Sequence, residues 1–428
     1  MRSADSHDGN RIAALPPLPS PKDARARWDL PVFSSWLLFL AVMAKPLSDA
    51  FYQVTAVKYG YMLLLGCASV LCKYGQVFQG AAADPRNKAL PGYIGLIMLY
   101  FIFLFILGAT YGGSLEEIFK IISPFVFFVL VAYAADRWLL PALAIGAVLT
   151  VLVNAAMLPF DYGWVMWGSV RTFKGYYFFK TDLAYALSFS VLLYAIYTRY
   201  RITPMLALLM LVASVEVFLA NSRLNYLNFL CVLLFIGIKQ GWSLRSMLRF
   251  GLLFALLAIV VTLALVHDPT HLLGFNTSSE AAFTQGRNIT WDHLIAAQKE
   301  SSPLQWLFGR GQFADLALSA QWVGVEATLT SQAHDAHNEF LHMIFTQGIT
   351  GCVFEIALWA MTFRMSSSPL MPRWARGTSA VALLLYLLQG MTAVMSSYAT
   401  KTWPLVMVLL ALRQISRTPD PAEPVRPA

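Results

Sequence analysis

Long apolar runs separated by short polar or basic segments make up most of the chain. A helix that crosses a membrane needs about 20 apolar residues, and most of the runs reach or approach this length. The three shortest runs are expected to tilt or to be extended by flanking residues. The apolar runs lie at about 32–44, 54–72, 92–111, 118–135, 138–158, 183–198, 202–219, 225–238, 248–266, 339–362, 378–396 and 402–412. This pattern predicts an all-α polytopic membrane protein with about twelve transmembrane helices.

Two longer polar segments interrupt the apolar pattern, at about 159–182 and about 267–336. The second is the larger and contains the stretch SSEAAFTQGRNITWDHLIAAQK. Within that stretch, four residues follow one another at i,i+4 spacing: Phe283, Arg287, Trp291 and Ile295. This spacing predicts a helix that lies along the membrane surface or over a cavity, although a simple amphipathic cap has the same periodicity.

Composition agrees with a membrane protein. Hydrophobic residues make up 58% of the chain and charged residues 13%, whereas a soluble domain carries about 25% charged residues. The polar, proline-containing ends at 1–30 and 414–428 are expected to be flexible cytoplasmic tails that flank one transmembrane domain at 31–413. All four cysteines lie within apolar runs, which favours a role in core packing over a disulfide framework or a zinc site.

The net charge of +8 is spread over the loops between the apolar runs. Most lysines and arginines fall in the loops on the same side as the N-terminus. Because basic loops stay on the cytoplasmic side, both termini are predicted to be cytoplasmic, and the segment 267–336 is predicted to face outward. The distribution therefore indicates membrane topology, and nucleic-acid binding is not expected.

Nine basic residues lie on the predicted outer side, against this topology bias. Four of them are singled out because they need a reason to be there: Arg171, Lys180, Arg223 and Arg287. An anionic ligand outside the cytoplasm, such as a diphosphate, is the simplest reason for their presence. For Arg223 there are two alternatives. Glu216, seven residues earlier, can serve as an ion-pair partner about two turns away, or the arginine can extend along the lipid surface to water.

The segment HDAHNEFLHMIFTQGITG, at 334–351, joins the large polar segment to an apolar run. On a helix that includes His337, Gly348 and Gly351 would lie roughly 20° and 40° from the azimuth of the histidine. Glycines on a membrane helix permit close approach of another helix, so this face is predicted to point into the bundle. An ionisable group placed there is a candidate functional group, with a simple helix-capping histidine as the alternative.

Several common catalytic motifs are missing from the sequence. It contains no GxxxxGK[ST] phosphate loop, no GxSxG nucleophile elbow, no HExxH zinc motif and no Asp-x-Asp pair. His334, His337 and His342 can in principle bind zinc, but cysteine or carboxylate partners at ligand spacing are not apparent. We therefore expect neither a metal nor another cofactor.

With these features the chain resembles the bacterial O-antigen ligases and their polymerase relatives, a family similar to the GT-C glycosyltransferases. The span pattern with a large loop before the tenth or eleventh helix is one feature of the resemblance. The motifs that carry it are Asn221-Ser222-Arg223, Gly286-Arg287 followed by Trp291, Gly309-x-Gly311, and His337-Asn338 followed by Gly348-x-x-Gly351. The stretch from Arg171 to Ala184 is also similar, but it has Lys180-Thr-Asp182 where the family usually has an asparagine.

The resemblance implies an inverting, metal-independent transferase in the bacterial inner membrane. It would move O-antigen polysaccharide from undecaprenyl diphosphate to a sugar hydroxyl of lipid A-core at the periplasmic face, under a cap formed by 267–336. The implied site has His337 as general base and Arg223, Arg287, Lys180 and Arg171 on the diphosphate, supported by Asn338, Asp335, Trp291, Gly348 and Gly351. An O-antigen or exopolysaccharide polymerase, or another lipid-linked oligosaccharide transferase, is the first alternative, and a lipid-linked sugar transporter is the second.

Overall fold

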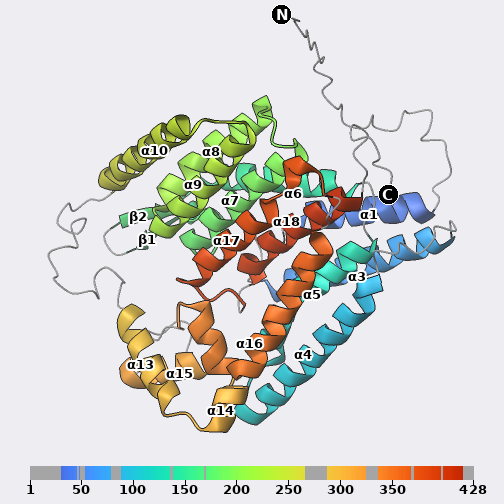
Figure 1. Cartoon of the computed structure of the whole chain (residues 1–428), viewed down its shortest axis with the longest axis vertical. Coiled ribbons are helices and arrows are strands. Elements are labelled where there is room, and N and C mark those ends of the chain that lie inside the picture. Colours follow the sequence, from blue (N-terminus) through green and yellow to red (C-terminus); the bar gives the residue numbers. More distant parts are fainter. Residues whose placement is uncertain are drawn as a thin grey trace, which may run out of the picture.

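The computed structural model describes residues 30–45, 48, 54–78, 88–134, 138–167, 170–265, 287–323, 336–367, 371–396 and 399–417. These residues form a predominantly helical bundle (Figure 1). Each predicted apolar run contains a helix, although the run 378–396 is helical only as far as Gly390. The corresponding helices are α1 (Leu30–Met43), α3 (Thr55–Phe78), α4 (Leu90–Tyr111), α5 (Leu115–Ala134), α6 (Leu139–Ala155), α7 (Lys180–Tyr197), α8 (Pro204–Ala220), α9 (Arg223–Lys239), α10 (Leu244–Leu265), α16 (Glu339–Ser366), α17 (Thr378–Gly390) and α18 (Ala399–Arg417).

Three of these helices, α4, α5 and α16, are long and apolar enough to cross a membrane by length and composition. Three further helices, α1, α6 and α8, are apolar but shorter than these three. The chain therefore has the character of a multi-pass membrane protein, and the count of twelve spans stays a prediction.

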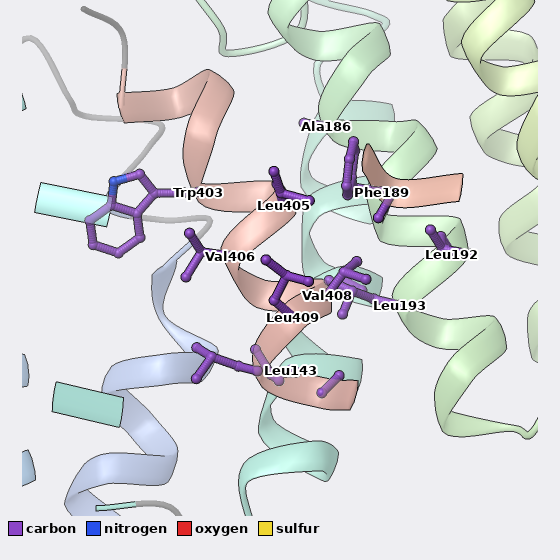
Figure 2. Packing of buried hydrophobic residues seen from close by; sticks show 14 of the residues in the cluster. Leu143, Ala186, Phe189, Leu192, Leu193, Trp403, Leu405, Val406, Val408 and Leu409 are labelled. Atoms are coloured by element: carbon purple, nitrogen blue, oxygen red, sulfur yellow. The ribbon is translucent and has the colours of Figure 1, made fainter. Parts of the chain in front are cut away.

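Helix α7 lies at the centre of the bundle and is buried along nearly its whole length. It packs against α6, α8, α9 and α18. Figure 2 shows part of this core, in which Phe189 and Leu193 of α7 lie near Leu405 and Val408 of α18. A helix that is apolar on all sides is stable only when neighbours surround it, so the surrounding helices fix the position of α7. Its polar N-terminal turn is thereby held at one end of the bundle.

The polar segment 159–182 contains a small hairpin that the apolar pattern did not predict. Strands β1 (Trp164–Trp167) and β2 (Val170–Phe173) pair antiparallel, with Trp164 opposite Phe173. After the hairpin, Gly175 has φ +57°, and a Cβ there would lie 1.9 Å from Oδ1 of Asn154. Because this oxygen accepts a hydrogen bond from the backbone N–H of Tyr176, the asparagine of α6 anchors the segment that leads into α7.

Three short helices form a cap at one end of the molecule, beside α16 (Figure 1). They are α13 (Arg287–Lys299), α14 (Pro303–Phe308) and α15 (Ala314–Val323). A small core of Leu294, Ala336 and Phe345 joins the cap to the first turns of α16. The amphipathic helix predicted in the large polar segment is confirmed from Arg287 onward, whereas Phe283 lies outside the described residues.

The prediction of one continuous helix through His337, Gly348 and Gly351 is wrong. α16 begins at Glu339, and His337 precedes it with φ +44°. The side chain of Asn338 accepts hydrogen bonds from two backbone N–H groups of the first turn, so it ends the helix on that side. Gly348 has φ +66° and ψ −169°, which interrupts the helix. The three residues therefore do not share one helical face.

The break at Gly348 accommodates a loop of the cap. The backbone N–H of Arg310 donates to the carbonyl of Phe345 at 3.0 Å, and that of Gly311 donates to the carbonyl of Thr346 at 3.0 Å. A Cβ on Gly348 would lie 2.5 Å from the backbone nitrogen of Gly309. Gly348 thus permits a close approach, as predicted, and its partners are the end of α14 at Leu307 and the loop at Gly309. A Cβ on Gly351 would first meet the side chain of Gln347 in the same helix.

Replacing Gly348 with alanine should destabilise the protein by about 1–3 kcal/mol, because the side chain meets backbone atoms and φ is positive. The measurement is the thermal unfolding midpoint in detergent. Gly92→Ala is the matched control, since a Cβ at this position of α4 meets nothing within 4 Å. Equal midpoints for the two variants would contradict the tight packing at Gly348.

Candidate functional site

The residue before His337 is held from both sides by the cap. The backbone N–H of Ala336 donates to Oδ2 of Asp315 on α15 at 2.9 Å, and the indole N–H of Trp291 on α13 donates to the Ala336 carbonyl at 2.8 Å. The same Asp315 oxygen lies 2.8 Å from Nδ1 of His342. We call these contacts the Ala336 clamp. They bind the cap and α16 to one short stretch of backbone.

The clamp explains how His337 keeps an unfavourable backbone conformation. A non-glycine residue in the left-handed region costs of the order of 1–3 kcal/mol and persists only where its neighbours fix it. Ala336 is fixed by the clamp on one side, and Asn338 is fixed by capping α16 on the other. The backbone of His337 is therefore set by the fold, and its side chain is half-buried at the junction between cap and bundle.

The described contacts of Asn338, one of the two residues predicted to orient the imidazole, are with the backbone. Its side-chain oxygen accepts from the backbone N–H groups of Phe340 and Leu341, and its amide donates to the carbonyl of Met391 at 3.4 Å. All of these partners are backbone groups, so Asn338 acts on His337 through the chain. Asp335, the other residue predicted to orient the ring, lies outside the described residues.

The N-terminal ends of α7 and α9 bring two of the predicted cations together. Nζ of Lys180 donates to the carbonyl of Asn221 at 3.3 Å, directly before the start of α9 at Arg223. Lys180 precedes the apolar run 183–198. Burial, and then the neighbouring positive charge of Arg223, lower the pKa of Lys180 to about 8. Two like charges at two helix N-termini form an arrangement that favours an anion.

Glu216 does not neutralise this charge. The residue is fully buried, and neither of its carboxylate oxygens has a hydrogen-bond partner. The predicted ion pair with Arg223 is wrong because the helix does not continue between them. α8 ends at Ala220, and Asn221 adopts the left-handed conformation with φ +48°. Arg223 instead lies exposed in the first turn of the next helix.

A chain of buried polar contacts joins the cation pair to the region around His337. Lys401 of α18 lies 3.8 Å from Asp182 of α7 and donates to the carbonyl of Val394 at 3.1 Å. Glu339, the first residue of α16, accepts from the backbone N–H groups of Met395 and Ser396. The segment 391–396, which also accepts from Asn338, therefore connects the start of α16 with the start of α7.

A second set of contacts joins α7, α9 and α17. The amide of Asn225 donates to the carbonyl of Thr181 at 3.2 Å and to the hydroxyl of Ser222 at 2.9 Å. Asn228, one turn later, donates to Gln389 at 3.3 Å. The sequence analysis did not identify Glu339, Gln389 and Lys401 as parts of these two sets of contacts. The only signal was the presence of polar side chains at the ends of apolar runs.

The other two predicted cations have different surroundings. Arg171 pairs with Asp161 at 2.7 Å and lies over the ring of Trp164, so its charge has a local partner in the hairpin. Among the described contacts, none links Arg171 to the cation pair at Lys180 and Arg223. Arg287 begins α13 and lies one turn before Trp291, on the face of the helix that carries the clamp.

The histidines considered as zinc ligands do not come together in the described part of the chain. His342 is buried against Asp315, and His334 lies outside the described residues. Within the described ranges, no group of three histidine, cysteine, aspartate or glutamate residues is arranged to hold a metal ion. His342 instead contributes to the Ala336 clamp.

Replacing Asp315 with asparagine should loosen the cap. The carboxylate accepts from a backbone N–H and contacts an imidazole in a buried position, and such charge-assisted contacts contribute about 1.5–3 kcal/mol. Limited proteolysis of the folded protein should then cut within the cap faster than in the parent. Asp292→Asn, at an exposed position of α13, is the control. Equal cleavage rates in both variants would show that the clamp does not hold the cap.

A comparison with known protein families finds a match for part of this chain. Residues 205–356 match the model of a family described as O-antigen ligase. No curated protein matches the chain. The matched segment runs from α8 through the cap to α16 and includes Arg223, Arg287 and His337, as well as the whole Ala336 clamp. This match supports an assignment of the chain to the O-antigen ligase family, which includes ligases and related polymerases.

Proposed function

We propose that the protein is an O-antigen ligase of the bacterial inner membrane, with its site at the periplasmic face. It transfers O-antigen polysaccharide from undecaprenyl diphosphate to a sugar hydroxyl of lipid A-core. The observation that carries this proposal is the cap, which fixes the backbone at His337 and is connected through buried polar contacts to the cation pair Lys180 and Arg223. A base and an anion site are the two parts that transfer from a lipid diphosphate requires.

The cation pair would hold the diphosphate of the donor. Lys180 and Arg223 stand at helix N-termini, where the backbone dipoles add to their positive charge. Each charge-assisted contact to phosphate is worth about 1.5–3 kcal/mol. The contacts stabilise the diphosphate as it leaves with the electron pair of the broken bond. Arg287 would add a third contact from the cap, and Arg171 is a weaker candidate because of its pairing with Asp161.

His337 would act as the general base. The acceptor hydroxyl attacks the anomeric carbon, its proton passes to the imidazole, and the bond from that carbon to the diphosphate oxygen breaks. Direct attack without a covalent intermediate inverts the anomeric configuration. A positioned imidazole accepts a proton near neutral pH, and such general-base catalysis typically contributes about 10²–10⁴-fold. The donor is already activated, so this step needs no nucleotide, and the Arg and Lys side chains are proposed to balance the charge of the diphosphate without a metal.

Deletion of the gene should leave lipopolysaccharide that carries the core alone. The parental gene should restore the polysaccharide, and a gene carrying His337→Ala should not. Lipopolysaccharide with the core plus a single repeat unit would instead identify a chain polymerase. Purified His337→Ala protein should transfer sugar about 10²–10⁴-fold more slowly than the parent.

His293→Ala is the control for the histidine substitution, because His293 lies on the cap against the ring of Trp322. This variant should retain nearly the parental rate. A strong chelator should not change the rate of the parental protein. Near-parental transfer by His337→Ala would remove its catalytic role, and loss of activity with the chelator would indicate a metal site.

Donor use should fall as the pH rises through about 8. The pKa of Lys180 is lowered to about 8, so the ammonium that binds the diphosphate is present below this pH and is lost above it. A guanidinium stays charged throughout the pH range in which Lys180 loses its proton, so Lys180→Arg should move the decline in kcat/KM for the donor to higher pH. Lys299→Arg, at the end of α13, is the control. An unchanged pH profile for Lys180→Arg would exclude Lys180 from donor binding.

A further inference from the structure

A cavity of about 400 Å³ lies in the cap, beside the small core that contains Ala336. Its walls come from the end of α4, the loop of Gly309 to Gln312, α15 and Phe345 of α16. The volume is within the range of about 300–1,000 Å³ that is common for small-molecule sites. We call it the glutamine cavity because Gln305, Gln312 and Gln321 all line it.

The lining of the glutamine cavity is polar but almost uncharged. Its one charged side chain is Arg310, whose guanidinium already donates to the Ala297 carbonyl at 2.7 Å and to the hydroxyl of Ser301. Aspartate, glutamate, lysine and histidine are absent from the described lining. A phosphate or a carboxylate bound here would lose hydration of its charge and would gain little opposite charge as partner. A neutral ligand with hydroxyl groups has no charge to balance.

Gln312 is the most deeply placed glutamine of the cavity wall. The side chain is 7% exposed, and its amide oxygen accepts from the backbone N–H of Ser114 at 3.1 Å. Its amide nitrogen is buried and has no hydrogen-bond partner. Gln312 therefore fixes the wall of the cavity against the residues that follow α4, and the glutamines left to meet a ligand are Gln305 and Gln321.

Amide and aromatic side chains together suit a sugar. Amides both donate and accept hydrogen bonds, which matches hydroxyl groups that do the same. Tyr111 and Phe313 supply apolar surface for the C–H groups of a sugar ring. We propose that the glutamine cavity binds a neutral sugar unit of one of the two substrates, away from the reacting bond. This inference rests on the proposed ligase function for the source of the sugar.

The cavity is connected to the candidate base, His337, through helix α15. Ala314, Ala317, Leu318 and Gln321 line it at the spacing of one face of α15. The neighbouring residue of the same helix, Asp315, holds Ala336 directly before His337. A sugar bound against this face of α15 would therefore stabilise the helix that positions the segment before His337.

Filling the cavity tests the proposal. Ala317→Trp should raise KM for one glycan substrate about tenfold or more with a much smaller effect on kcat. A rise for the lipid-linked donor assigns the site to the O-antigen, and a rise for lipid A-core assigns it to the acceptor. Ala296→Trp introduces the same side chain at an exposed position of α13 and is the matched control. Parental KM values for both substrates in Ala317→Trp would overturn the proposal.

Direct binding separates this proposal from the proposed function. Lipid-free O-antigen oligosaccharide and lipid-free core oligosaccharide are titrated onto the purified full-length protein by calorimetry. One of them should bind the parent and Ala296→Trp, but not Ala317→Trp. Binding of neither to the parent, or equal binding to both variants, would overturn the cavity assignment even if transfer is normal. If the parental protein binds an oligosaccharide but transfers no sugar, the ligase function is overturned and the cavity assignment stands.

A second variant covers the case in which Ala317→Trp disturbs the cap. Gln321 is exposed at the end of α15, so Gln321→Leu removes a hydrogen-bonding group without a change in the core. If Ala317→Trp lowers the thermal unfolding midpoint, the oligosaccharide affinity of Gln321→Leu tests the binding site in its place. Several-fold weaker oligosaccharide binding supports the site, and parental binding excludes it.

Discussion

The hydrogen bonds to the backbone of Ala336 are the contacts on which the arrangement of the site depends. Asp315 and Trp291 reach this residue from two different cap helices, and His342 reaches the same Asp315 oxygen from α16. Together with the capping of α16 by Asn338, they hold the backbone of His337 in a left-handed conformation. The site is thus determined by long-range contacts of the cap, and the strained residue lies where the cap meets the bundle.

The bundle supplies the other half of the site through α7. Because this helix is buried on nearly every side, its N-terminal turn has a fixed position, and the contacts of Lys180 and Asp182 extend from it to α9 and α18. A buried pair such as Asp182 and Lys401 adds little net stability, since desolvation offsets much of the attraction. Its value lies in geometry, because it joins the cation pair to the segment 391–396 that also holds the start of α16.

Hydrophobic periodicity was sufficient to predict all twelve apolar helices and the cap helix from Arg287 onward, since these depend on local sequence. It failed at His337 and Gly348, where an asparagine cap and a docked loop override the apparent helix. It also failed at Glu216, because the left-handed turn at Asn221 interrupts the spacing on which the pairing with Arg223 relied. The contacts of Asp315 and Lys401 connect residues distant in sequence, and no local pattern indicates them.

The central claim is that diphosphate binding and proton transfer belong to different parts of the site. It is tested most directly by the affinity of purified variants for undecaprenyl diphosphate, the product that carries the anionic group. His337→Ala should bind it as tightly as the parent while failing to transfer sugar, and Arg223→Ala should bind it about tenfold or more weakly, as loss of one charge-assisted contact requires. An equal loss of affinity in both variants, or parental affinity in Arg223→Ala, would contradict the division of roles.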